Sequence, residues 1–134
     1  FVVLHSPRAP QSIPWPTEVK IPVGEAGKRL FFLGNVHGWS SQDPGTGPWG
    51  AVAEYEIVYA DGQRQTVPLI TGRTIDEWTA RPEADEVQVG PRGAPWHLNV
   101  LAVALRDVPV QEVVFRDLGT PAAPVLAAVT LERK

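Results

Sequence analysis

The chain has 134 residues, of which 43% are hydrophobic and 20% are charged, and its formal net charge at pH 7 is −3. This length and composition are typical of one globular domain and exclude a disordered chain. The sequence contains no cysteine and no methionine, which excludes a disulfide framework, a thiolate metal site and a cysteine nucleophile.

Fourteen prolines and twelve glycines divide the chain into short segments, which argues against a helical bundle because proline interrupts helices. Within these segments apolar and polar residues alternate, the period of a half-buried β-strand. In residues 51–60 this alternation puts Tyr55 and Tyr59 on one face, toward the core or cross-strand neighbours, and Glu54 and Glu56 on the other. The first 16 residues indicate an edge strand followed by an extended arm. The further strands that we expect, in chain order, span residues 18–23, 28–35, 51–60, 63–70, 86–89, 97–105, 110–118 and 125–131.

The connections carry their own signals. Asp61-Gly62 lies between two alternating runs and predicts a tight hairpin in which both turn residues have positive φ. Residues 36–50 and 80–95 are expected to be loops, the second of which can hold the brief strand at 86–89, and residues 121–124 are expected to form a turn. Residues 72–79 form a loop that can hold one helical turn, with Thr74 as its cap and Glu77 as the capping-box partner. Eight or nine strands without a helix of ten residues predict an all-β, antiparallel two-sheet β-sandwich, with an open barrel as the alternative.

Three stretches resemble a known family: IPVGEAGKRLFFLGNVHGW at 21–39, YEIVYADGQRQTVPLITGRTIDEW at 55–78, and PVQEVVFRDLGTPAAPVLAAVTLE at 109–132. They are similar to the jelly-roll, galactose-binding-domain-like β-sandwich modules that are attached to bacterial glycoside hydrolases and related polysaccharide-degrading proteins. Those modules commonly carry two adjacent tryptophans at the end of the second stretch. Here the second of the pair is Thr79, so only Trp78 remains.

The resemblance implies a non-catalytic carbohydrate-binding module, secreted or on the cell surface of a bacterium, that targets an attached catalytic domain to polysaccharide. We expect residues 1–134 to form one module excised from a larger multidomain protein, because the chain lacks an initiator methionine and begins in the character of a strand. The resemblance also allows a structural calcium ion, which the sequence does not locate.

All five tryptophans lie in connecting segments rich in proline and glycine rather than in expected strands. An aromatic ring can stack on the C–H face of a pyranose, and loops are where such rings are presented. We therefore expect Trp39, Trp49, Trp78 and Trp96 to line a carbohydrate-binding surface, and Trp15, between two prolines, to pack. The alternative is that each tryptophan covers one end of the core.

Polar residues near two of these tryptophans complete the candidate site. Asn35 and His37 precede Trp39 and offer an amide and an imidazole, which suit the paired donors and acceptors of sugar hydroxyls. Arg73 can fork two vicinal hydroxyls, or it can pair with Asp76 and fix the loop before Trp78. Local hydrogen bonding within the loop is the alternative for the first pair.

Other functions find less support in the sequence. Glu54 and Glu56 would lie about 7 Å apart on one strand face, a spacing compatible with a glycosidase acid pair but also present on any solvated strand. There is no G-x-S-x-G motif and the three histidines are isolated, so we expect neither an enzyme nor a zinc site. Scattered basic residues and the absence of an 18-residue apolar run argue against nucleic acid and a membrane span. The competing class is a structural sandwich that packs on a neighbouring catalytic domain without binding sugar.

Overall fold

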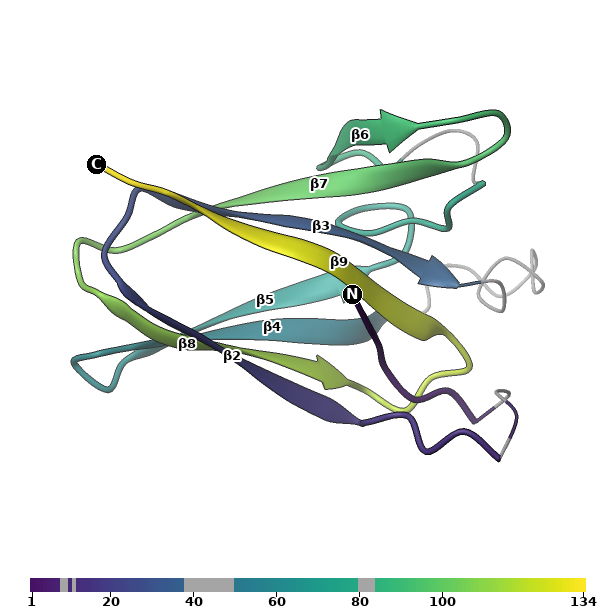
Figure 1. The fold of residues 1–134 in the computed structure, drawn as a ribbon, viewed down its shortest axis with the longest axis horizontal. Coiled ribbons are helices and arrows are strands. Elements are labelled where there is room, and N and C mark those ends of the chain that lie inside the picture. The colour runs from purple at the N-terminus through teal and green to yellow at the C-terminus, as the bar shows by residue number, and fades with distance from the viewer. Residues whose placement is uncertain (8–9, 11, 38–49, 80–83) are drawn as a thin grey trace.

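The computed structural model describes residues 1–7, 10, 12–37, 50–79 and 84–134, and these residues form two antiparallel β-sheets and no helix (Figure 1). The predicted β-sandwich of eight or nine strands is confirmed. Its strands are β1 (Val2–Val3), β2 (Glu18–Glu25), β3 (Arg29–His37), β4 (Ala51–Tyr59), β5 (Arg64–Ile70), β6 (Gln88–Arg92), β7 (His97–Ala104), β8 (Val110–Asp117) and β9 (Ala123–Glu132).

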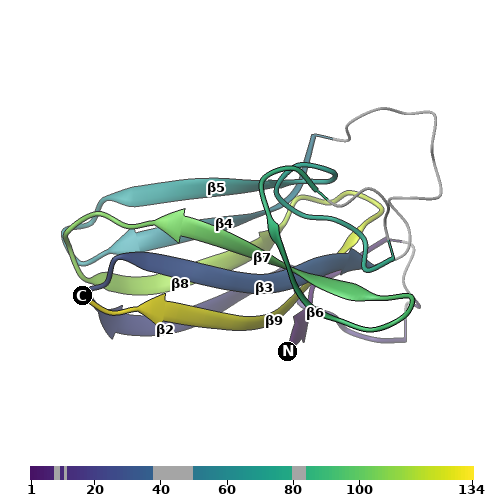
Figure 2. The same cartoon turned by 90° about the horizontal axis from the view of Figure 1, so that it is seen from above.

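The two sheets contain strands from both ends of the chain. One has five strands in the order β1-β9-β3-β7-β6, and the other has four in the order β2-β8-β4-β5. Figure 2 looks onto the five-stranded sheet, with the four-stranded sheet behind it. β3 lies between β9 and β7 and is central, as its run of apolar residues predicts, and β1 is an edge strand, as predicted for the start of the chain.

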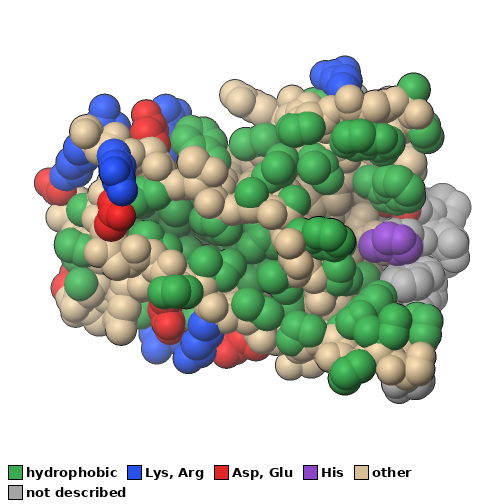
Figure 3. Space-filling view, viewed as in Figure 1, with side chains coloured by type: hydrophobic (Ala, Val, Ile, Leu, Met, Phe, Trp, Pro, Cys, Tyr) green, Lys and Arg blue, Asp and Glu red, His purple; other side chains and the backbone are tan. Residues whose placement is uncertain are grey.

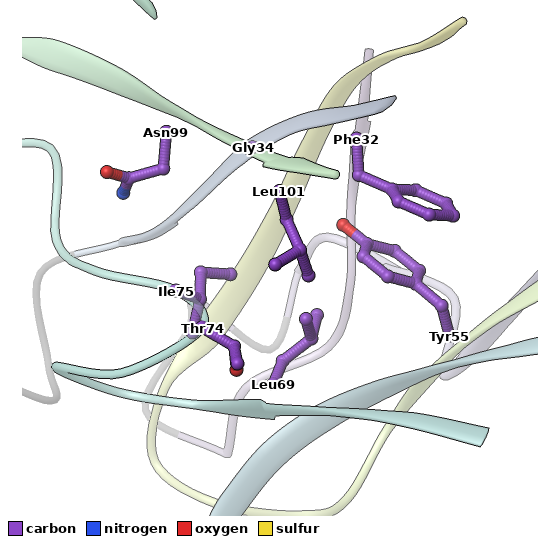
Figure 4. A pocket seen from close by; sticks show the side chains of 8 residues that line it. All are labelled: Phe32, Gly34, Tyr55, Leu69, Thr74, Ile75, Asn99 and Leu101. Atoms are coloured by element: carbon purple, nitrogen blue, oxygen red, sulfur yellow. The ribbon is translucent and has the colours of Figure 1, made fainter. Parts of the chain in front are cut away.

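An aromatic stack joins the two sheets in the core. The ring of Phe32 on β3 lies 4.0 Å from that of Tyr55 on β4, with planes 11° apart, and Tyr55 is 5.0 Å from Phe115 on β8. All three side chains are buried, and burial raises the pKa of the Tyr55 hydroxyl far above its ordinary value. In Figure 4 this hydroxyl points toward Leu101, beside a cavity of about 10 Å³. The alternation along β4 is confirmed, since Tyr55 and Tyr59 both face the core.

The outer face of the four-stranded sheet carries charges that are paired across strands. Register places Arg116 of β8 between Glu18 of β2 and Glu54 of β4, and its guanidinium lies 2.9 Å and 2.5 Å from their carboxylates. Arg64 lies 2.6 Å from Glu56. Glu54 and Glu56 therefore belong to a network of ion pairs on a solvated strand face.

The outer face of the five-stranded sheet is apolar instead. Leu30 and Phe32 point into the core, so the alternate residues Phe31 and Leu33 of β3 point outward. Leu98 and Val100 lie at the outward positions of β7, and Val100 is directly across from Leu33. Figure 3 has the view of Figure 1, which looks at the two sheets from the side, and it shows hydrophobic side chains across the middle of the molecule and most charged ones toward the end that holds the C-terminus.

The hairpin between β4 and β5 has a longer loop than predicted. Tyr59 N donates to Gln63 O, and Gly62 N donates to Tyr59 O, so residues 60–62 form a three-residue loop. Gly62 has a φ of 81°, and no described residue other than glycine has positive φ. The prediction that Asp61 adopts positive φ was therefore wrong. A type I turn followed by one left-handed glycine needs positive φ only at Gly62.

The helical turn predicted in residues 72–79 is also absent. Gly72, with a φ of 81°, turns the chain back, and both Arg73 N and Thr74 N donate to Ile70 O. The Thr74 hydroxyl donates to Pro68 O and accepts from Ile70 N, each at 2.8 Å. The Thr74 hydroxyl thus bonds to backbone groups at the edge of β5 and does not cap a helix.

Two proline-containing segments that the sequence placed in loops or turns belong to strands. β6 runs from Gln88 through Pro91, beyond the brief strand expected at 86–89. It is the edge strand of its sheet, where a residue without a backbone N–H is tolerated. β9 begins at Ala123, before Pro124, whose carbonyl accepts a hydrogen bond from Leu4 N.

Gly34 allows β3 and β9 to approach each other where their register shifts. A Cβ at Gly34 would lie 2.4 Å from the carbonyl oxygen of Val125. We expect Gly34→Ala to lower the free energy of unfolding by about 1–3 kcal/mol, because the backbone must move to relieve the contact. Urea unfolding measures this loss. Gly50→Ala is the control, since nothing lies within 4 Å of its added methyl group. Equal stability of the two variants would contradict the close approach.

Candidate functional site

An open groove of about 360 Å³ lies at the end of the five-stranded sheet where β3 finishes. Segments far apart in sequence build it: the N-terminal strand and arm, the last residues of β3, the turn after β5, and the strands β7 and β9. Figure 2 shows the N-terminus at the edge of this sheet, where β1 pairs with β9. The groove is lined by Phe1, Val3, Trp15, Asn35, Val36, His37, Trp78, Leu98 and Val125.

His37 and Trp78 form an aromatic pair in the groove. Their ring planes are 15° apart and their centroids are separated by 6.3 Å. The Trp78 side chain is 43% exposed, and His37 is also exposed. Their backbones are held together because Val36 N donates to Asp76 O at 2.9 Å and Val36 forms a bridge with Glu77. Two nearly parallel, stacked rings thus lie together at the surface.

Asn35 lies beneath the groove and joins two strands. Backbone pairing of β3 with β7 ends at Gly34 and Asn99. Just beyond this point the Asn35 amide donates to His97 O at 2.9 Å and accepts from Asn99 N at 3.1 Å. The side chain is buried, and its amide continues the ladder in place of a backbone peptide. Asn35 therefore positions the strand that carries His37.

Arg73 and Asp76 were also predicted to bind the ligand, and the structure does not pair their side chains with each other. Arg73 pairs with Glu86 at 2.5 Å, rather than with Asp76 as the sequence alternative had it. Glu86 N also donates to Arg73 O, so the ion pair secures the approach to β6. Asp76 is buried, and one of its carboxylate oxygens accepts from Glu77 N at 2.7 Å.

Of the predicted site residues, the groove brings together Asn35, His37 and Trp78. Trp96 is 38% exposed but lies outside the groove lining, against Gly93, whose added Cβ would be 2.6 Å from the indole nitrogen. Arg73 is not part of the lining either. Trp39 and Trp49 lie outside the described residues.

Sequence reasoning missed the contribution of the N-terminal segment. Trp15, expected to pack, is half-buried and lines the groove together with Phe1 and Val3. The alternation of Phe1 and Val3 was a signal that they share a strand face. That face became part of a groove only because β1 pairs with β9, with Val3 opposite Val125.

Hydrogen bonds and a contact between the side chains of His5 and Asp117 hold this segment on the sandwich. His5 N donates to Pro16 O, and the Ser6 hydroxyl donates to Pro121 O at 2.6 Å. The His5 imidazole lies 3.8 Å from the carboxylate of Asp117, whose side chain is 3% exposed. Burial raises the pKa of Asp117 despite the opposing effects of nearby backbone N–H groups and of His5.

The described residues contain no group of three or more His, Asp or Glu side chains that could hold a metal ion. The structure therefore does not locate the calcium ion that the resemblance allows. In the same part of the chain, no helix has the length and apolar character needed to cross a membrane.

Comparison with known proteins adds no relative. No family model matches the sequence, and neither the curated proteins nor the solved structures contain a significant match.

The role of Asn35 can be tested by Asn35→Asp. The introduced carboxylate can accept from Asn99 N but cannot donate to His97 O. We expect a loss of at least about 3 kcal/mol of stability at pH 7, because a charge is buried beside an unpaired carbonyl. Part of this loss should be recovered near pH 4, where a protonated carboxyl can donate. Urea unfolding at both pH values measures it. Asn35→Ala, which adds no titratable group, should show no such recovery; identical pH profiles would contradict the assignment.

The buried carboxylate of Asp117 leads to a second prediction, on how stability depends on pH. Since its pKa is raised in the folded state, folding favours the protonated form, and stability falls as pH rises from the unfolded pKa through the folded one. We expect Asp117→Asn to reduce the loss of stability between about pH 4 and about pH 7. Denaturant unfolding at several pH values in this range tests it. A constant difference between the variant and the wild type would contradict the effect of burial.

Proposed function

We propose that the chain is a non-catalytic carbohydrate-binding module of an extracellular bacterial protein, and that polysaccharide binds in the groove that holds Trp15, His37 and Trp78. The observation that carries this proposal is the exposed, nearly parallel pair of rings from His37 and Trp78. Aromatic faces stack on the C–H faces of pyranoses, and a groove of about 360 Å³ is within the usual size of a small-ligand site.

The distribution of carboxylates supports a binding role over a catalytic one. Glu54 and Glu56, the pair with acid–base spacing, are bound by Arg116 and Arg64 on the outer face of the opposite sheet. Neither residue lines the groove. A module of this kind would act by raising the local concentration of an attached enzyme on its substrate.

Trp78→Ala tests the proposal directly. Removal of the exposed ring should weaken binding to a retained polysaccharide by about tenfold, the loss expected for one aromatic stacking contact. Affinity electrophoresis on a panel of polysaccharides, followed by calorimetry, measures this change. Trp96→Ala is the matched control, because this tryptophan is similarly exposed but lies outside the groove.

Equal weakening by the two substitutions would contradict binding in the groove. A wild-type protein that is retained by no polysaccharide would contradict the function itself.

The second candidate is a structural sandwich that packs on a neighbouring catalytic domain. The observation that favours it is the apolar outer face of the five-stranded sheet, where Phe31, Leu33 and Val100 are only half-buried. Apolar surface of this kind is typical of contacts between domains. In this role no polysaccharide would bind, and Trp78→Ala would weaken association with the adjacent domain instead.

A further inference from the structure

Resting on the proposed function, we infer that the ligand of the groove is a neutral polysaccharide whose pyranose rings carry equatorial hydroxyls, and not a polyanionic one. The inference concerns the class of glycan and follows from the charges and the polarity of the residues around the rings of His37 and Trp78.

The first argument is the lining itself. Among the described residues that line the groove, none has a permanently charged side chain. Val3, Val36, Leu98 and Val125 contribute aliphatic groups. A uronate or sulfate placed among them would lose water without gaining a counter-charge, which is costly.

The second argument is where the positive charges lie. Arg29 begins β3 while His37 ends it, so the two are about 26 Å apart along the strand, and Arg29 is bound to Glu132. Arg64 and Arg116 are paired with glutamates on the other sheet. In Figure 3 most of the charged side chains in view lie toward the end that holds the C-terminus, from which β3 points away in Figure 1, although one Lys or Arg side chain stands over β6.

The third argument is the overall charge of the chain. Its net charge of −3 repels polyanions rather than attracting them.

The small number of polar groups in the groove indicates which kind of pyranose would stack on its aromatic rings. The Asn35 amide already bonds to His97 and Asn99, so it is committed to the fold. A sugar hydroxyl pressed against the aliphatic part of the lining would lose its bonds to water without gaining a partner there, at a cost in affinity. Pyranoses with equatorial hydroxyls present axial C–H groups on both faces, and such faces meet an aromatic ring without burying a hydroxyl. Gluco- and xylo-configured chains have this property.

Binding is measured with a neutral β-glucan and a xylan against polygalacturonate and dextran sulfate, at about 0.05 M and about 1 M NaCl. We expect retention by the neutral polymers, changed less than about twofold by salt because no ion pair is screened, and no retention by the polyanions. Trp78→Ala should weaken the neutral retention by about tenfold, whereas Trp96→Ala should keep it.

Retention by a polyanion that weakens more than about fivefold in high salt would overturn the inference and leave the proposed function standing. Binding to none of the four polymers or a wider panel would overturn the proposed function, and the inference with it.

Discussion

The stack of Phe32, Tyr55 and Phe115 between the two sheets is the contact on which the rest of the structure depends. It commits one face of β3, β4 and β8 to the core. Because side chains alternate along a strand, this commitment also decides what the outer faces show. With Tyr55 inside, Glu54 and Glu56 must face solvent, and with Phe32 inside, Phe31 and Leu33 must face outward. The stack thus determines that the outer face of the four-stranded sheet is charged and that of the five-stranded sheet is apolar.

The groove arises where this regular arrangement ends. β3 and β7 stop pairing after Gly34 and Asn99, and the buried amide of Asn35 keeps them together beyond that point. The end of β3 can therefore carry His37 outward, next to the turn that holds Trp78, without leaving backbone groups unbonded. A rigid support for exposed rings lowers the entropy lost when a ligand stacks on them. The same residues that stabilise the fold thus prepare the surface on which the proposed function rests.

The candidate site was partly predictable from sequence. Loop position and proline-rich context identified Trp78 as a surface residue, and its neighbours Asn35 and His37 were also selected. The roles within that set were not predictable, because they depend on contacts between distant residues. The Asn35 side chain bonds to the neighbouring strand β7. Arg73 pairs with Glu86 rather than with Asp76, because the turn at Gly72 directs the Arg73 side chain toward the residues that precede β6. Trp15 and Phe1 joined the groove through the pairing of β1 with β9.

By itself the sequence determined the all-β class, the position of most strands and the fact that Tyr55 and Tyr59 point to the same face of their strand. These features were predictable because alternation with a period of two and turn-forming residues are local properties of the chain. Only the tertiary structure decided which strands are neighbours, where β6 and β9 begin and end, and that the Asp61-Gly62 hairpin has three loop residues. It also decided that His37 and Trp78 lie ring beside ring. The physical reason is that strand pairing and ring contacts depend on how both sheets close over one core, and no local stretch of the chain contains that information.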